Sequence, residues 1–438
     1  MFMVPPILVD RSKNIETESN MPKLHGIKAS LLIPGRGPPI KNGTLIIHEK
    51  SIAWVGPHSS LPAKYSVVPF TQVETLMPGL WDCHVHFLGS DSLAGFSSIV
   101  SQPAVLSAAR IVKDLERTLL AGFTSVRELA GYAGEMSPAI EEGTILGPNV
   151  YSSIGIMSMT AGHGDIHNLP IETVLDACAK RGIPFAVCDG VPDCIRTVRL
   201  MIRRGAKVIK VCATGGVYSM IDDPEAAQFS PDELRAIVDE AARAKRVVAA
   251  HCHGKDGIIN ALNAGVRTIE HGSFLDEECV KLMKEKDAIL VATSLVVEGG
   301  MENLDGLPPV NRAKMIATAA VHRRAYKLAV TSGVRIALGT DQGTSLGDTY
   351  NTHGRNGKEL FYAVEAGMSP LQAIEAATAM GPETLGANFA KTSGQLKEGY
   401  DADVIAISGN PLDDIKLLAE ARNVSHVWKG GKIFKSPS

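Results

Sequence analysis

The sequence predicts an α/β protein: a (β/α)8 TIM barrel with a small β-sandwich domain built from both chain ends. Three observations lead to this prediction. Apolar, β-rich runs alternate with amphipathic stretches through the middle of the chain. Several of these runs are almost wholly apolar, as in parallel strands buried on both faces. A β-rich segment flanks the middle region on each side, which indicates that the two ends complete one further domain.

The predicted barrel domain covers residues 76–392. Its eight expected strands are 76–87, 124–129, 150–156, 207–213, 247–251, 268–271, 289–293 and 335–339. Amphipathic periodicity predicts helices at 105–121, 231–244, 277–286, 311–332 and 369–378. An open doubly wound sheet is the alternative, but no G-x-G-x-x-G turn supports it.

The β-sandwich domain is predicted in two parts, 22–75 and 393–438, with residues 1–21 as an N-terminal arm. The expected strands of the first part are short apolar runs at 29–33, 44–48 and 51–55, separated by turn residues. The second part repeats this character at 402–407 and 424–428, followed by the turn Lys429-Gly-Gly-Lys432.

Composition narrows the class of protein. The 438 residues carry 44 basic and 47 acidic side chains, so there is no basic excess for non-specific nucleic-acid binding. No run approaches the roughly 18 apolar residues of a membrane span. Seven cysteines without paired spacing predict reduced thiols. The short apolar start lacks the basic lead of a secretory signal, so we expect a cytoplasmic protein unless a signal upstream of Met1 has been removed.

Polar residues that close apolar strands predict a metal site. His84 and His86 lie two residues apart on a predicted strand, so both imidazoles point to the same face. His251, His271 and Asp341 each follow an apolar run at its carboxyl end, which is the active-site face of such barrels. Imidazole and carboxylate groups are ligands that zinc accepts.

Lys210 lies within a run, 206–212, that otherwise suits a buried strand. A buried, unpaired ammonium is costly. The side chain could therefore be neutral, be paired with a carboxylate, or be carboxylated by CO₂ to an anionic carbamate. A carbamate has two oxygens, enough to bridge two metal ions.

The pattern of H-x-H on the first strand, Lys on the fourth, His on the fifth and sixth, and Asp on the eighth resembles the amidohydrolase superfamily. The flanking motifs Met77-Pro-Gly-Leu80 and Gly399-Tyr-Asp-Ala-Asp-Val404 match as well. The chain is most similar to the branch of fungal ochratoxinases and related Xaa-Pro and aminoacyl dipeptidases. The motifs that carry this similarity are Thr160–Asp165, Arg203–Lys210, Ala226–Ser230, Ala250–Gly254 and Val427–Gly431.

This resemblance implies two divalent metal ions, with zinc expected and manganese, iron or nickel as alternatives. His84, His86 and Asp341 would hold the first ion, and His251 and His271 the second. Lys210, as N6-carboxylysine, would bridge them. The resemblance further implies that a hydroxide shared by the two ions attacks the scissile carbonyl, while Asp341 transfers the proton to the leaving amine.

Two further histidines and a tyrosine are candidates for substrate contacts. His253 lies two residues beyond His251, and His163 falls in a loop after the third strand. Either could donate to the oxyanion or bind a substrate carboxylate, and packing or loop roles are the competing interpretation. Tyr218 is a candidate partner of the substrate carbonyl. The cysteines next to ligands (Cys83, Cys212 and Cys252) should face the opposite side of their strands.

The resemblance implies a small-molecule substrate: an N-acyl or N-aroyl amino acid of the ochratoxin A type, cleaved as by a carboxypeptidase, or a small dipeptide. Tyr218, which some dipeptidase relatives share, leaves the substrate open. A cyclic-amide hydrolase of the imidazolonepropionase type is the alternative, and the resemblance implies a homo-oligomer. A catalytically dead scaffold would lack ligands, whereas all six positions are filled here.

Overall fold

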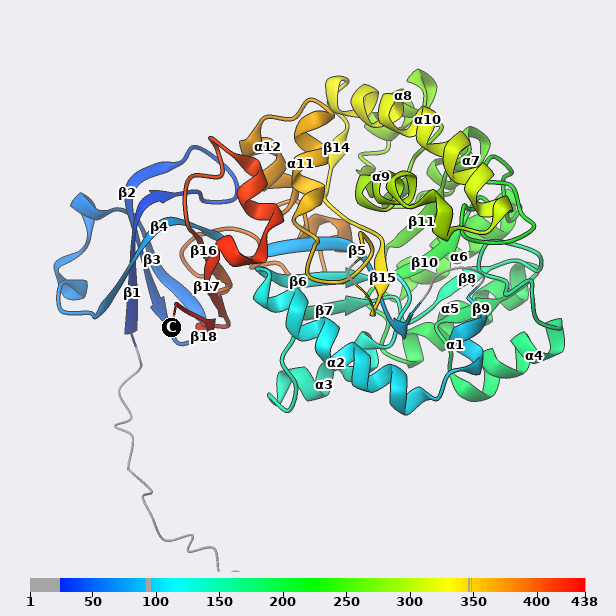
Figure 1. Cartoon of the computed structure of the whole chain (residues 1–438), viewed down its shortest axis with the longest axis horizontal. Coiled ribbons are helices and arrows are strands. Elements are labelled where there is room, and N and C mark those ends of the chain that lie inside the picture. Colours follow the sequence, from blue (N-terminus) through cyan, green and yellow to red (C-terminus); the bar gives the residue numbers. More distant parts are fainter. Residues whose placement is uncertain (1–23, 92–95, 346, 348, 438) are drawn as a thin grey trace, which may run out of the picture.

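The computed structural model describes residues 24–91, 96–345, 347 and 349–437, so the predicted arm at 1–21 lies outside the described residues. Strands from both chain ends form one mixed sheet, at the left of Figure 1. Parallel pairing joins β1 to β4, and the other neighbours are antiparallel. The order across this sheet is β18 (Lys432–Lys435), β17 (Val424–Lys429), β16 (Val404–Ile407), β4 (Phe70–Pro78), β1 (Leu24–Leu32), β2 (Ile40–His48) and β3 (Ser51–Pro57).

Parallel strands form the second body of the chain, at the right of Figure 1. One sheet contains β5 (Leu80–Ser90), β6 (Phe123–Glu128) and β7 (Asn149–Ser152), joined at its edge by β15 (Gln342–Thr344). The other contains β9 (Phe185–Val187), β8 (Ile156–Ser158), β10 (Ile209–Cys212), β11 (Val248–Cys252), β12 (Thr268–His271), β13 (Ile289–Val291) and β14 (Arg335–Ile336).

Backbone hydrogen bonds join these two sheets at both seams. Lys207 N donates to Ser152 O at 2.8 Å, and Cys83 N donates to Leu338 O at 2.8 Å. The strands therefore close into the predicted barrel, with β7 and β8 together at its third position.

The first expected barrel strand, 76–87, is divided at Gly79 in the structure. Residues up to Pro78 pair with β1 and β16 in the mixed sheet, and the barrel strand β5 begins at Leu80. Gly79 allows this close junction, because a Cβ there would lie 2.0 Å from Thr124 Oγ1. The three-residue strands β9 and β15 were not predicted from the sequence.

Helices follow the barrel strands and cover them from outside. The expected helices are found as α2 (Ala104–Leu120), α6 (Pro231–Arg243), α8 (Glu277–Glu285), α10 (Pro309–Thr331) and α12 (Pro370–Ala376). The others are α1 (Ser97–Ser101), α3 (Ala133–Glu141), α4 (Ile171–Asp176), α5 (Val191–Arg203), α7 (Lys255–Ala264), α9 (Ser294–Glu302) and α11 (Lys358–Glu365). Ser230 with Glu233 and Ser369 with Gln372 form capping boxes that start α6 and α12. Among the described helices, none has the length and apolarity needed to cross a membrane.

The two bodies share an apolar core. Met77, Phe123, Leu338, Ile405 and Val427 belong to one buried cluster that joins the mixed sheet to the barrel. The barrel strands are packed on both faces, as their apolar sequences predict. This leaves the carboxyl ends of the strands as the place where polar side chains meet.

Candidate metal centre

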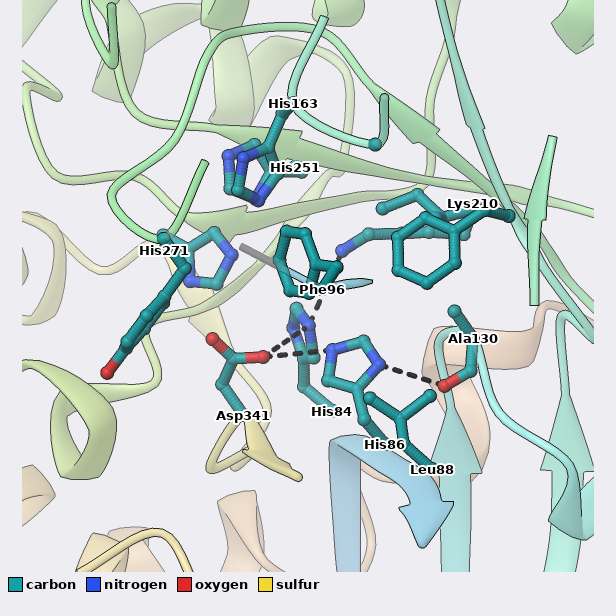
Figure 2. A pocket seen from close by; sticks show the side chains of 14 residues that line it. His84, His86, Leu88, Phe96, Ala130, His163, Lys210, His251, His271 and Asp341 are labelled. Atoms are coloured by element: carbon teal, nitrogen blue, oxygen red, sulfur yellow. Dashed lines mark hydrogen bonds and ion pairs between the residues drawn. The ribbon is translucent and has the colours of Figure 1, made fainter. Parts of the chain in front are cut away.

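The six predicted ligand residues come together at the carboxyl end of the barrel (Figure 2). His84 and His86 lie on β5, and Lys210 lies on β10. His251 and His271 stand at the ends of β11 and β12, and Asp341 follows β14. All six line one cavity.

The first group of donors consists of His84, His86 and Asp341. Asp341 Oδ1 lies 3.3 Å from His84 Nε2 and 2.9 Å from His86 Nε2. The three donor atoms lie within 4.8 Å of one another, close enough to share one metal ion.

The second group consists of His251, His253 and His271, whose donor atoms also lie within 4.8 Å of one another. The two groups adjoin, since the rings of His84 and His271 are 5.0 Å apart. Lys210 Nζ reaches the centre and lies 3.4 Å from His84 Nε2.

Each ligand imidazole is anchored through one nitrogen, which leaves the other nitrogen directed at the centre. Such outer contacts fix the orientation and tautomer of metal-binding histidines. The anchored pairs are His84 Nδ1 with Glu270 Oε2, His86 Nδ1 with Ala130 O, His251 Nε2 with Gly215 O, and His271 Nδ1 with Thr293 Oγ1. The donor set therefore fits divalent metal ions.

Burial favours the uncharged form of the His84, His251 and His271 imidazoles, which is the form that binds metal. Desolvation lowers the pKa of His84 to about 4, and the pKa values of His251 and His271 fall well below the usual range for the same reason. Burial also lowers the pKa of Lys210. Burial raises the pKa of Asp341, but the neighbouring His84 and His86 outweigh it and bring the value to about 2.

A buried ion pair holds His84 of the first group in place, and it was not predicted from the sequence. Glu270 on β12 accepts from His84 through one oxygen, and Arg127 Nη2 donates to its other oxygen at 2.7 Å. Arg127 Nε also donates to Cys83 O on β5. The acidic Glu270, on a short strand whose residues are all buried, is the signal that could have revealed it.

The structure also brings His163, His253 and Tyr218 to this centre. The His163 ring stacks on His251 with centroids 4.2 Å apart, and its Nδ1 lies 2.8 Å from Ser219 Oγ. His253 Nδ1 lies 2.8 Å from Ser273 Oγ. The Tyr218 hydroxyl lies 2.9 Å from that of Tyr350, a residue that the sequence did not indicate. Their roles in substrate binding remain predictions.

The cavity has two adjoining lobes that share part of their lining. The first lobe has an apolar wall of Leu88, Phe96, Ile156 and Phe185. The second lobe contains His253 and an apolar wall of Val217, Val296, Val297 and Met315. Both are bordered by His163, Tyr218, His251, His271 and Asp341.

None of the three cysteines beside the candidate ligands lines this cavity. Cys212, two residues from Lys210 on β10, nevertheless packs in the cluster that contains the wall residues Leu88, Ile156 and Phe185, so the predicted opposite face does not describe it. Cys83, Cys212 and Cys252 belong to three separate buried clusters of the apolar core. All are free thiols, and burial raises the pKa of Cys83 and Cys212 to about 12.

Fold and site together define an α/β-barrel hydrolase with two histidine-rich candidate metal sites. The chain matches the model of the Amidohydrolase family over residues 75–434 and belongs to that family. It is 50% identical to ochratoxinase of Aspergillus niger over 425 residues, which are 94% of this chain and 86% of that protein. The protein is an ochratoxinase-like amidohydrolase, a hydrolase acting on amide C–N bonds.

Solved structures show the same similarity. The crystal structure of A. niger ochratoxinase has a TM-score of 0.88 at 48% identity, covering 95% of this chain and 96% of the other. A prolidase solved with N-methylphosphonate-L-proline has a TM-score of 0.84 at 33% identity, covering 94% of this chain and all (100%) of the other.

Proposed function

We propose that this amidohydrolase uses two metal ions to cleave the amide bond of N-acyl or N-aroyl amino acids of the ochratoxin A type. The observation that carries the proposal is the position of two adjoining donor groups at two adjoining apolar lobes. The names of the similar ochratoxinase and prolidase support an amide that lies next to a carboxylate.

The proposed ligands of the first ion are His84, His86 and Asp341, and those of the second are His251 and His271. Zinc suits this set of imidazole and carboxylate groups. When bound, two divalent ions polarise the amide carbonyl and lower the pKa of a bound water. Lys210 would help to hold the ions as N6-carboxylysine, because its Nζ reaches the centre, 3.4 Å from His84 Nε2, and burial lowers the pKa of its amine, and only a neutral amine reacts with CO₂.

The two lobes imply one orientation of the bound substrate. An aroyl group suits the first lobe, where Phe96 and Phe185 lie with ring centroids 5.3 Å apart. The amino-acid part then occupies the second lobe, where the carboxylate faces His253 and the side chain meets Val296 and Met315.

The remaining groups are placed for the chemistry at the amide. Asp341 lines both lobes and can take the proton of the attacking water and return it to the leaving nitrogen. His163 is directed at the same space by its contact with Ser219 and can stabilise the developing oxyanion. The Tyr218 hydroxyl, paired with Tyr350, is the proposed partner of the substrate carbonyl.

A hydrolysis panel tests this proposal. Zinc-loaded enzyme is assayed with ochratoxin A, N-benzoyl-L-phenylalanine, dipeptides including Xaa-Pro, and imidazolonepropionate as the cyclic amide. We expect the N-aroyl amino acids to give the highest kcat/KM. Lys210→Gln should abolish turnover, whereas Lys207→Gln, three residues earlier in the chain, should retain it. Preferred turnover of the cyclic amide would overturn the proposal in favour of the imidazolonepropionase type.

A further inference from the structure

A chain of four hydrogen-bonding side chains leads from the second lobe to the outside of the barrel. His253 Nδ1 lies 2.8 Å from Ser273 Oγ, which in turn lies 3.2 Å from His322 Nδ1. On the far side of this ring, His322 Nε2 lies 3.3 Å from Ser294 Oγ. Ser294 lines a groove at the surface together with Glu298 and Arg323.

These four side chains come from four different parts of the barrel and are all buried. His253 follows β11, Ser273 follows β12, Ser294 begins α9, and His322 lies in the middle of α10. Their exposed fractions are 4% or less. Burial lowers the pKa of His322 to about 4, so its ring is neutral near pH 7, with one N–H and one bare nitrogen.

Two orders of donors are possible when each hydroxyl donates its hydrogen within the chain. In one order, Ser294 donates to His322, His322 donates to Ser273, and Ser273 donates to His253 Nδ1. The free Nε2 of His253 then carries the hydrogen. In the reverse order His253 Nδ1–H donates outward, and Nε2 presents a lone pair instead. The groove at Ser294 lets water complete either order.

We propose that Ser273, His322 and Ser294 are positioning residues that hold His253 in the tautomer with an N–H at Nε2, ready to bind the substrate carboxylate. This inference rests on the proposed function. It adds His322, which lines neither lobe, to the residues that support substrate binding. A carboxylate only accepts hydrogen bonds, so it selects this order. A carboxamide both donates and accepts, so it pairs with either tautomer.

The difference between the two ligands provides the test. Wild type and variants, all loaded with zinc, are assayed for benzoate release from N-benzoyl-L-phenylalanine and from N-benzoyl-L-phenylalaninamide. For His322→Phe, Ser273→Ala and Ser294→Ala we expect KM for the acid to rise about threefold to tenfold, the value of one hydrogen bond. KM for the carboxamide should stay within about twofold, because that group does not depend on the tautomer.

Two further variants separate positioning from packing. Thr318→Val is the matched control, because Thr318 lies one turn before His322 on α10 and its buried hydroxyl has no partner among the described residues. His322→Gln should restore part of the affinity for the acid, because its amide can donate to Ser273 and accept from Ser294. If His322→Phe does not fold, Ser294→Ala at the groove still provides the KM comparison.

The outcomes distinguish the positioning role of the three residues from the proposed function of the enzyme. If wild type hydrolyses the acid and KM for the acid is unchanged in all three variants, the positioning role alone is overturned. An equal rise of KM for acid and carboxamide also overturns it, because the variants would then act through packing. No turnover of either compound by wild type overturns the proposed function, and the positioning role falls with it.

Discussion

Glu270 Oε2 lies 2.9 Å from His84 Nδ1, and both side chains are buried, at 0% and 1% exposure. This contact fixes the direction of His84 Nε2 toward Asp341 and Lys210. Arg127, also fully buried, neutralises the carboxylate from the other side at 2.7 Å. Burial alone raises the pKa of Glu270, but Arg127 and His84 outweigh it and bring the pKa to about 2.

Glu270→Gln should therefore weaken metal binding without removing a ligand. The amide still fills the space but no longer raises the basicity of His84, and losses of such outer contacts cost about 10-fold to 100-fold in metal affinity. Zinc dissociation constants from competition with a chelator check this. Glu128→Gln is the matched control, since this buried carboxylate on β6 binds backbone N–H groups of Ala133 and Gly134. Equal affinities for both variants and wild type would contradict the role of Glu270.

Gly216→Ala should disable His163 while leaving the metal ligands in place. A Cβ at Gly216 would lie 2.2 Å from the His163 ring, so the imidazole has to move. We expect kcat/KM for N-aroyl amino acids to fall at least about tenfold, as for loss of one oxyanion donor. Two zinc ions per chain should remain, as checked by elemental analysis. Gly306→Ala serves as control, because nothing lies within 4 Å of the added Cβ. A fully active Gly216→Ala enzyme would argue against His163.

Phe185→Ala should shift specificity away from aroyl groups. The ring forms part of the apolar wall of the first lobe, and deleting buried aromatic surface costs about 1–3 kcal/mol of binding, or roughly 5-fold to 150-fold. The kcat/KM ratio of N-benzoyl-L-phenylalanine to N-acetyl-L-phenylalanine measures the effect. That ratio should fall, because the acetyl group leaves the wall uncovered in either enzyme. An unchanged ratio would place the acyl group in the other lobe.

Acid should destabilise the metal-free protein below about pH 6.5. Burial lowers the pKa of His84, His163 and His322 to about 4, and that of His253 and His353 to about 3. At these five imidazoles the unfolded chain binds more protons than the folded one between these values and 6.5, so their contribution to stability is lost as pH falls. Asp82, Asp114 and Asp403, whose pKa burial raises to about 6, contribute in the opposite sense between about pH 4 and 6 and reduce the net slope. Asp341 and Glu270, with pKa values near 2, add to this loss only below about pH 4.5.

Urea midpoints of the metal-free protein from pH 7.5 to 4.5 measure this dependence. His353→Gln should reduce the slope by one proton, about 1.4 kcal/mol per pH unit. The variant keeps a donor for the His86 carbonyl, which His353 Nε2 contacts at 3.2 Å. A slope that His353→Gln leaves unchanged would contradict a neutral His353 in the folded protein.

The sequence predicted the barrel and the meeting of the candidate ligand residues for a physical reason. A polar residue that ends an apolar strand is exceptional, and parallel strands bring all such ends together. The same reasoning could not find Tyr350 or His322, because their partners come from loops or helices far along the chain. His322 lies on a helix away from every strand end, and its buried ring joins Ser273 to Ser294. The division of 76–87 at Gly79 was also missed, although Pro78-Gly79 is a turn signal within that run.

The central claim is that the two histidine groups and Lys210 together hold two catalytic metal ions. The most direct test removes all metal with a chelator, then adds zinc stepwise in bicarbonate buffer while elemental content and hydrolysis of N-benzoyl-L-phenylalanine are followed. We predict no turnover without metal and full turnover at two zinc ions per chain. We also predict no recovery for Lys210→Gln at any zinc concentration. Turnover by metal-free enzyme, or full activity of Lys210→Gln, would contradict the account.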